Sequence, residues 1–149
     1  MINESYIAGK FKKSIAEYPQ YSLAVKNIPG ISDLLIQLPG GKCVFVEFKR
    51  VSRFGGNKFS LTSLTNYQAA FLAKWQMHGG NCFLFAGATA PEEPVEYIVV
   101  KLKHWKSWLS VNEAKHSMNE MALSTSNIDK VGEWFRNEYG RLTINGEVT

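Results

Sequence analysis

A glutamate and a lysine two positions apart, Glu47 and Lys49, stand in a short apolar segment of the chain. Side chains alternate between the two faces of a β-strand, so Glu47 and Lys49 share one face while Val46 and Phe48 point to the other. A second acid, Asp33, stands in the preceding apolar segment. Two carboxylates beside an ammonium group have the composition of a site that binds a hard metal ion and acts on a phosphate.

The segments that carry these residues have the pattern of a β-hairpin. Ile31–Leu38 and Lys42–Lys49 flank the turn sequence Pro39-Gly40-Gly41, in which glycine can adopt a left-handed conformation. If the loop has three residues, Leu38 lies opposite Lys42, and Asp33 then lies opposite Glu47 on the same face. A loop of two residues would turn Asp33 to the other face, because a slip of one residue inverts every side chain.

Opposed carboxylates repel each other, and a divalent cation between them would remove the repulsion. Oxygen ligands favour Mg²⁺ or Mn²⁺, and the peptide carbonyl of Phe48 could supply a further oxygen. A metal-bound water is a nucleophile near neutral pH, and Lys49 could orient it or add positive charge at the attacked phosphate. A solvated strand edge would show the same Glu-x-Lys triplet, so the triplet alone does not decide between the two interpretations.

The remaining elements follow from apolar periodicity and from turn residues. We expect a helix over Glu4–Tyr18 that ends before Pro19, and a polar loop over Arg50–Ser60. The other expected elements are a helix from Ser63 or Thr65 to His78, strands at Asn81–Ala88 and Val95–Leu102, a helix that starts near His104, and a helix at Ile128–Tyr139 capped by Asn127. A hairpin followed by a helical crossover to a further strand predicts a mixed sheet with helices on both faces, an α/β (α+β) fold.

Composition narrows the class of protein. The 149 residues are 45% hydrophobic, which suits a single domain over 1–149 with one sizeable core. No apolar run is long enough to cross a membrane, and the N-terminal residues lack the apolar segment of a secretory signal. Cys43 and Cys82 lack the spacing of a zinc site. We therefore expect a cytoplasmic, or more broadly intracellular, protein without a membrane partner.

The positive charge is concentrated in the first part of the chain. Residues 1–60 contain nine Lys/Arg and four Asp/Glu, whereas residues 61–149 contain eight and nine. The cations near the candidate site are Lys10, Lys12, Lys13, Arg50, Arg53 and Lys58. This asymmetry fits a polyanion such as DNA, and it equally fits an ordinary basic surface.

Taken together, these segments resemble the PD-(D/E)XK nuclease superfamily. The resemblance rests on Gly30-Ile31-Ser32-Asp33 and Val46-Glu47-Phe48-Lys49. It continues through Phe59-Ser60-Leu61-Thr62, Gln68 and the run Gly79–Leu84, which is similar to RecU-type Holliday-junction resolvases and to VRR-NUC nucleases. It covers about Glu4 to Ala88, and Ser32 stands where the family's namesake proline would be.

The resemblance implies a restriction-endonuclease-like α-β-β-β-α-β core over about 4–88, followed by a C-terminal strand and helices over 95–140. It implies Asp33 and Glu47 as metal ligands, Lys49 as the catalytic lysine, and Gln68 as a group that positions the lysine or a phosphate. Such nucleases often carry one more carboxylate on the first helix. Glu4 and Glu17 are the candidates, and Glu4 has the spacing from Asp33 that is similar to the family's.

The function that the resemblance implies is Mg²⁺-dependent or Mn²⁺-dependent cleavage of DNA phosphodiesters, with branched DNA such as Holliday junctions as the leading substrate. A resolvase cuts two strands symmetrically, which implies a homodimer. The alternatives are a VRR-NUC or restriction-type nuclease that acts on another DNA structure, and a non-catalytic DNA-binding module on the same fold. In the loop that we expect after Lys49, Phe54 could stack on a base or pack into the core.

Overall fold

The computed structural model of the chain describes residues 2–23, 28–101 and 115–142. The expected helix near His104 therefore lies outside the described residues. The helices are α1 (Glu4–Ser14), α2 (Asn66–Met77) and α4 (Ile128–Tyr139), and two short 3₁₀ turns cover Pro39–Gly41 and Met118–Glu120. The strands are β1 (Gln20–Ser22), β2 (Leu34–Gln37), β3 (Cys43–Phe54), β4 (Lys58–Ser60), β5 (Asn81–Thr89), β6 (Glu96–Val100), β7 (Lys115–Ser117) and β8 (Leu123–Thr125).

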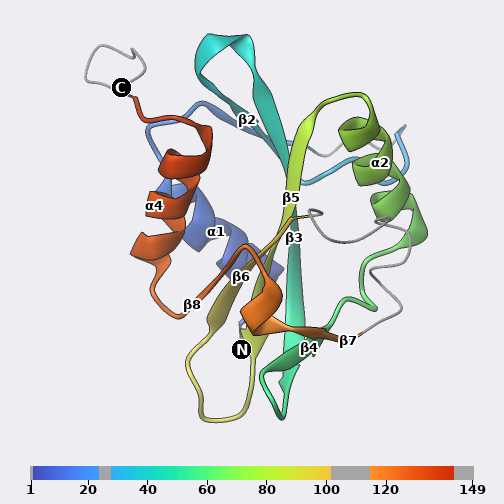
Figure 1. Cartoon of the computed structure of the whole chain (residues 1–149), viewed down its shortest axis with the longest axis vertical. Helices are drawn as coiled ribbons and strands as arrows, with labels where there is room; N and C mark the ends of the chain where they lie inside the picture. Colours follow the sequence, from blue (N-terminus) through green and yellow to red (C-terminus); the bar gives the residue numbers. More distant parts are fainter. Residues whose placement is uncertain (1, 24–27, 102–114, 143–149) are drawn as a thin grey trace.

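One mixed sheet organises the molecule (Figure 1). Its strand order is β1-β2-β3-β5-β6-β8, and β4 and β7 extend the sheet beside the far end of β3. The pair β3–β5 is parallel, with α2 as the connection between the two strands, and every other described pair is antiparallel. The expected mixed sheet is therefore confirmed, and the order α-β-β-β-α-β is present with one additional short strand.

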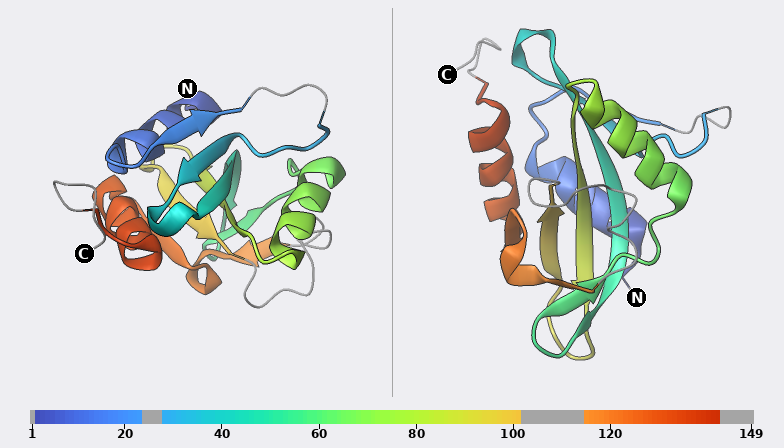
Figure 2. Two further views of the ribbon diagram at one scale, coloured as in Figure 1. Left: turned by 90° about the horizontal axis from the view of Figure 1, so that it is seen from above. Right: turned by 45° about the vertical axis from the view of Figure 1, so that its right-hand side comes forward.

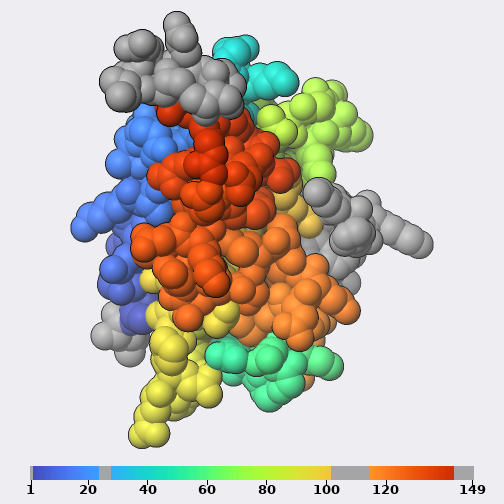
Figure 3. All heavy atoms as spheres, turned by 60° about the vertical axis from the view of Figure 1, so that its left-hand side comes forward, coloured from blue at the N-terminus to red at the C-terminus, as the bar shows by residue number. Residues whose placement is uncertain are grey.

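Helices cover both faces of this sheet, as Figure 2 shows from above. On one face α1 and α4 pack over the side chains that include Val46 and Phe48, and Phe11 of α1 lies at the centre of this core. The Phe11 and Phe85 ring centroids are 4.8 Å apart. The other face carries α2 over Phe45 and Leu84. Figure 3 shows α4 at the surface, beside the N-terminal part of the chain and above the segment around β8.

The hairpin has the register that the three-residue loop predicts. Leu34 pairs with Val46, and the amide of Leu38 donates to the carbonyl of Lys42. Within the turn Gly40 and Gly41 have φ angles of 79° and 77°, which an L-residue rarely adopts. Asp33 consequently stands one residue before β2, opposite Glu47 of β3.

The first helix is shorter than expected, because α1 ends at Ser14 and not at Tyr18. Its end is fixed by Gln20, whose side-chain amide donates to the carbonyls of Lys12 and Ile15. The chain then forms β1, which lies at the edge of the sheet beside β2. A residue six positions beyond the helix satisfies its last carbonyls, and helical periodicity does not reveal such a contact.

The expected polar loop over Arg50–Ser60 is wrong, because most of this segment is strand. β3 continues to Phe54, turns at Gly55–Asn57 and returns as β4. Ser52 pairs with Thr89 of β5, and Phe59 of β4 pairs with His116 of β7. Pairing partners distant in sequence override a composition that locally favours a loop.

Gly30 allows the start of α2 to lie close to the segment that leads into β2. Its φ is +76°, and a Cβ at this position would lie 2.1 Å from the carbonyl oxygen of Tyr67. We expect Gly30→Ala to lower the free energy of unfolding by more than about 1 kcal/mol, since both the backbone angle and the contact oppose it. The control is Gly9→Ala within α1, where the added methyl meets nothing within 4 Å. Thermal unfolding checks this, and equal melting temperatures for the two variants would contradict it.

Candidate active site

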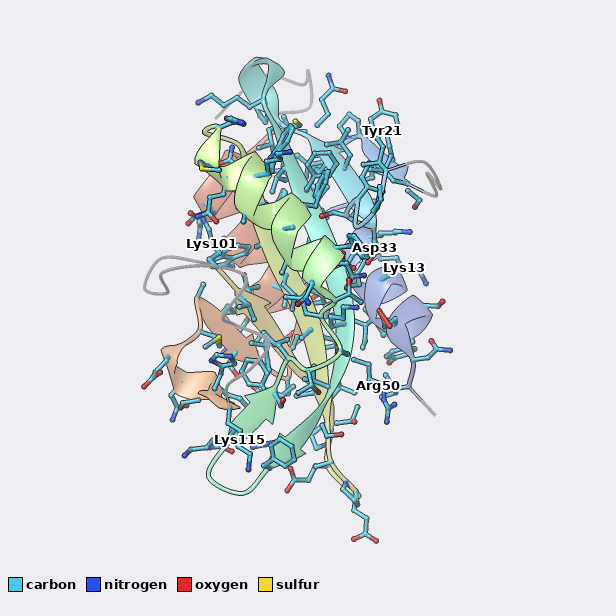
Figure 4. The ribbon with its side chains drawn as sticks, turned by 90° about the vertical axis from the view of Figure 1, so that its right-hand side faces the viewer. Lys13, Tyr21, Asp33, Arg50, Lys101 and Lys115 are labelled. Carbon is cyan, nitrogen blue, oxygen red and sulfur yellow. The ribbon has the colours of Figure 1, made fainter. Side chains whose placement is uncertain are left out.

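The candidate site lies where β2 begins, beside the middle of β3. The Oδ2 atom of Asp33 accepts the backbone amide of Phe48 at 2.9 Å, and the carbonyl of Asp33 accepts the amide of Leu23 at 2.9 Å. The Asp33 carboxylate therefore occupies a place on β3 that a ladder bond from β2 would otherwise take. Figure 4 shows Asp33 between α2 and α1.

Glu47 is the buried acid of the site. It lies on β3 between β2 and β5 and is only 1% exposed, and its Oε1 atom has no hydrogen-bond partner among the described residues. Burial raises the pKa of Glu47 to about 10, and the hydrogen bond and negative charge of Asp33 act in the same direction. The ammonium of Lys49, itself 6% exposed, acts in the opposite direction.

These atoms fit a hard divalent cation. The described part of the chain contains no group of three or more His, Cys, Asp or Glu side chains that could hold a metal ion. The site offers instead the carboxylates of Asp33 and Glu47 and one backbone carbonyl. The amide and the carbonyl of an extended residue point to the same side of the strand, so the Phe48 carbonyl points to the side on which its amide contacts Asp33. Mg²⁺ commonly takes one or two carboxylates and keeps several waters. The unpartnered Oε1 of Glu47 is an atom that such an ion would satisfy.

The burial of Glu47 predicts how the stability of the metal-free protein changes with pH. The pKa of Glu47 is raised from 4.5 to about 10 on folding, so its contribution to stability is fully present below pH 4.5 and is lost as the pH rises toward 10. We expect the melting temperature in EDTA to fall between pH 5 and pH 9 more steeply for the native protein than for Glu47→Gln. Thermal unfolding at several pH values checks this, and parallel curves for the two proteins would contradict it.

The two candidates for an additional acid on α1 occupy different places. Glu4, exposed in the first turn, lines a cavity of about 260 Å³ together with Asp33 and Phe48. Glu17 instead accepts hydrogen bonds from Arg136 at 2.6 Å and 3.0 Å, and this hydrogen bonding lowers the pKa of Glu17. Glu4 is thus the acid that the structure places beside Asp33, and Glu17 is engaged with α4.

Gln68 has a different contact from the one expected. The side-chain Oε1 atom of Gln68 accepts a hydrogen bond from the backbone amide of Thr65 at 3.0 Å, and the backbone amide of Gln68 donates to Oγ1 of Thr65 at 3.1 Å. This reciprocal pair is a capping box that starts α2. Among the described residues no hydrogen bond joins Gln68 to Lys49, so the structure gives Gln68 a role in beginning the helix that packs over the site.

The basic residues divide into paired and available cations. Arg53, expected in a loop, lies on β3 and is paired with Glu93 at 2.9 Å and with Asn57 at 2.6 Å. The amine of Lys10 lies 5.6 Å from the centre of the Tyr6 ring. Lys13, Arg50 and Lys58 are exposed. Figure 4 shows Lys13 and Arg50 on the side of the molecule that carries Asp33.

Two serines of the site were not identified from the sequence. Ser5 and Ser22 line the same cavity as Glu4, Asp33 and Lys12. Glu4, Ala8 and Lys12 recur every four residues on one face of α1, and this spacing could have identified the helical wall. Ser22 had no comparable signal, because its place depends on β1 pairing with β2.

The protein thus has an α+β fold, with two carboxylates and a lysine at the base of a hairpin. No protein-family model and no curated protein sequence matches the chain. Among solved structures the chain is similar to Hjc, a Holliday junction resolvase from the archaeal hyperthermophile Archaeoglobus fulgidus. The identity is 12%, the match covers 86% of this chain and 98% of that chain, and the TM-score is 0.48. A similarity of this degree transfers neither residue roles nor activity, so function has to be argued from the site itself. No described helix is long and apolar enough to cross a membrane.

Proposed function

We propose that this protein is a metal-dependent DNA endonuclease of the PD-(D/E)XK type that hydrolyses phosphodiester bonds. The observation that carries the proposal is the arrangement of three residues around β3. Glu47 is buried and one of its oxygens has no hydrogen-bond partner among the described residues, and Lys49 is buried on the same face of the strand. Asp33 accepts a hydrogen bond from the backbone amide of Phe48, which lies between them. A buried carboxylate oxygen with no hydrogen-bond partner is costly, and groups with strongly shifted pKa values concentrate at functional sites. Mg²⁺ or Mn²⁺ is the cofactor that these oxygens favour.

In this proposal each residue has a distinct task. Asp33, Glu47 and the Phe48 carbonyl would hold the ion, which supplies an activated water and stabilises negative charge on the phosphate. Lys49 places a positive charge beside the attacked phosphate without binding the ion. Asp33 also fixes the position of its carboxylate relative to β3, because its hydrogen bond from the Phe48 amide joins the residue before β2 to β3. Glu4, at the rim of the cavity, is the acid best placed to orient water or a further ion.

The substrate that we propose is DNA, with branched DNA such as Holliday junctions as the leading structure. The first 60 residues contain an excess of five positive charges, and these include the exposed Lys13 and Arg50 on the side of Asp33. Symmetrical cutting of a junction requires two sites, so the proposal includes a homodimer that acts on DNA inside the cell.

A panel of labelled DNAs tests the proposal. Junction, flap, duplex and single-stranded substrates are incubated with Mg²⁺, with Mn²⁺ and with EDTA, and products are resolved by electrophoresis. We expect internal cleavage with either ion and none in EDTA, with the junction cut fastest. Binding to every DNA without cleavage under any metal condition would contradict the proposal and favour a non-catalytic DNA-binding module.

The available cations predict how DNA binding depends on salt. Each neutralised phosphate contributes about −0.9 to the slope of log K against log salt on duplex DNA, so Lys13→Ala with Arg50→Ala should reduce the slope by about 1–2. The control replaces Arg53 by Met and Glu93 by Gln, which removes an ion pair without changing the net charge. Titrations at several salt concentrations measure both slopes. An unchanged slope for the Lys13 and Arg50 variant would exclude these residues from the DNA path.

A further inference from the structure

The cavity beside the candidate site is lined by groups of both charges. Glu4 and Asp33 contribute carboxylates to it, and Lys12 contributes an amine beside the hydroxyl of Ser22. α1 contributes Glu4, Ala8 and Lys12 from one helical face, and Ser22 of β1, Asp33 before β2 and Phe48 of β3 also line the cavity. The volume of about 260 Å³ leaves room for solvent or for part of a ligand.

Lys12 is held at this cavity by a neutral partner. Its Nζ atom donates to Oγ of Ser22 at 2.8 Å, and it forms no ion pair with a described carboxylate. Arg53, Lys101, Arg136 and Arg141 are each paired with a glutamate. An ammonium group has three donors, so the bond to Ser22 orients Lys12 and leaves donors for an anion.

Glu4 and Lys12 lie on one face of α1 but at different positions along the helix. Glu4 and Lys12 are eight residues apart, which is about 12 Å of helix at 1.5 Å per residue. Helical side chains lean toward the N-terminus, so Lys12 extends toward the acidic end and covers part of this distance. Lys12 lines the same cavity as Asp33, so a phosphate held by Lys12 would lie close to the proposed metal site.

We propose that Lys12, oriented by Ser22, binds a phosphate near the cleaved one and so sets the strand in register with Asp33 and Glu47. This inference rests on the proposed function and adds a second phosphate-binding position to it. Lys12 is then a binding residue with one specific contact, and Ser22 is a positioning residue. Lys13, one residue along α1, is exposed and does not line the cavity.

Duplexes and junctions that carry a single methylphosphonate test this inference. The uncharged group is moved one position at a time along the strand on both sides of the cut, and the cleavage rate and Kd are measured for the native protein and for Lys12→Met. We expect one position at which the uncharged group slows the native protein about tenfold, as for the loss of a charge-assisted hydrogen bond. At that position Lys12→Met should show no further loss, whereas at all other positions the two effects should multiply.

Two further variants keep the result interpretable. Ser22→Ala should weaken the coupling to the same phosphate while Lys12 is still present, and Lys130→Ala, which removes an exposed lysine of α4, should retain the native pattern. If the native protein cuts DNA but the effects multiply at every position, the inference fails and the proposed nuclease stands. If no DNA is cut, the Kd measurements decide: coupling at one position supports the Lys12 contact without the nuclease, and the absence of coupling overturns it.

Discussion

Asp33→Asn and Glu47→Gln should each lower the cleavage rate at least about a thousand-fold while DNA binding is retained or becomes tighter. Both changes remove a negative charge that the metal ion requires, and both keep nearly the native shape. The amide side chain that replaces the Asp33 carboxylate keeps an oxygen that can accept the Phe48 amide, so the junction of β2 and β3 should remain intact. Loss of the Asp33 charge also reduces the repulsion of phosphate, so tighter binding is expected for Asp33→Asn, whereas Glu47→Gln should leave binding in EDTA unchanged because burial keeps Glu47 protonated without the ion.

Rate measurements at saturating Mg²⁺, together with Kd measurements in Ca²⁺ or EDTA, check this expectation. Glu17→Gln is the matched control, because it removes a carboxylate from the same N-terminal region but from an ion pair with Arg136. We expect Glu17→Gln to cleave normally. Near-native cleavage by either Asp33→Asn or Glu47→Gln would show that the site has been assigned to the wrong acids.

Lys49→Ala should lower kcat about a hundred-fold to a thousand-fold and change the affinity for Mg²⁺ little. The lysine is buried on the face of Glu47, and in the proposal it acts on the phosphate and not on the ion. The alternative role is charge balance, since Lys49 partly offsets the effect of burial on the pKa of Glu47. If charge balance were its only task, metal binding would weaken and excess Mg²⁺ would restore the rate.

Single-turnover rates measured against Mg²⁺ concentration separate the two roles. Lys49→Arg keeps the charge with a different shape, so it should retain the metal affinity of the native protein and recover only part of kcat. A melting temperature for each variant shows that the fold persists. Full recovery of Lys49→Ala at high Mg²⁺ would contradict a direct action on the phosphate.

The sequence by itself determined the parts of the site that depend on local geometry. A three-residue turn and the two-residue period of a strand fix the relation of Asp33 to Glu47 and Lys49, and the structure has that register. The same alternation predicted that Val46 and Phe48 face the opposite side, where α1 and α4 pack. Turn residues and caps are read within a few positions, so a single sequence contains this information.

Only the tertiary structure decided the parts that depend on partners distant in sequence. The segment after Lys49 became strand because β5 and β7 pair with it, and Arg53 is neutralised by Glu93, forty positions away. Glu17 forms an ion pair with Arg136 of α4, whereas Glu4 lines the cavity. Lys12 is oriented at the cavity by its hydrogen bond to Ser22 of β1. In each case the outcome depends on how separate elements pack against one another, and periodicity within one segment does not encode that packing.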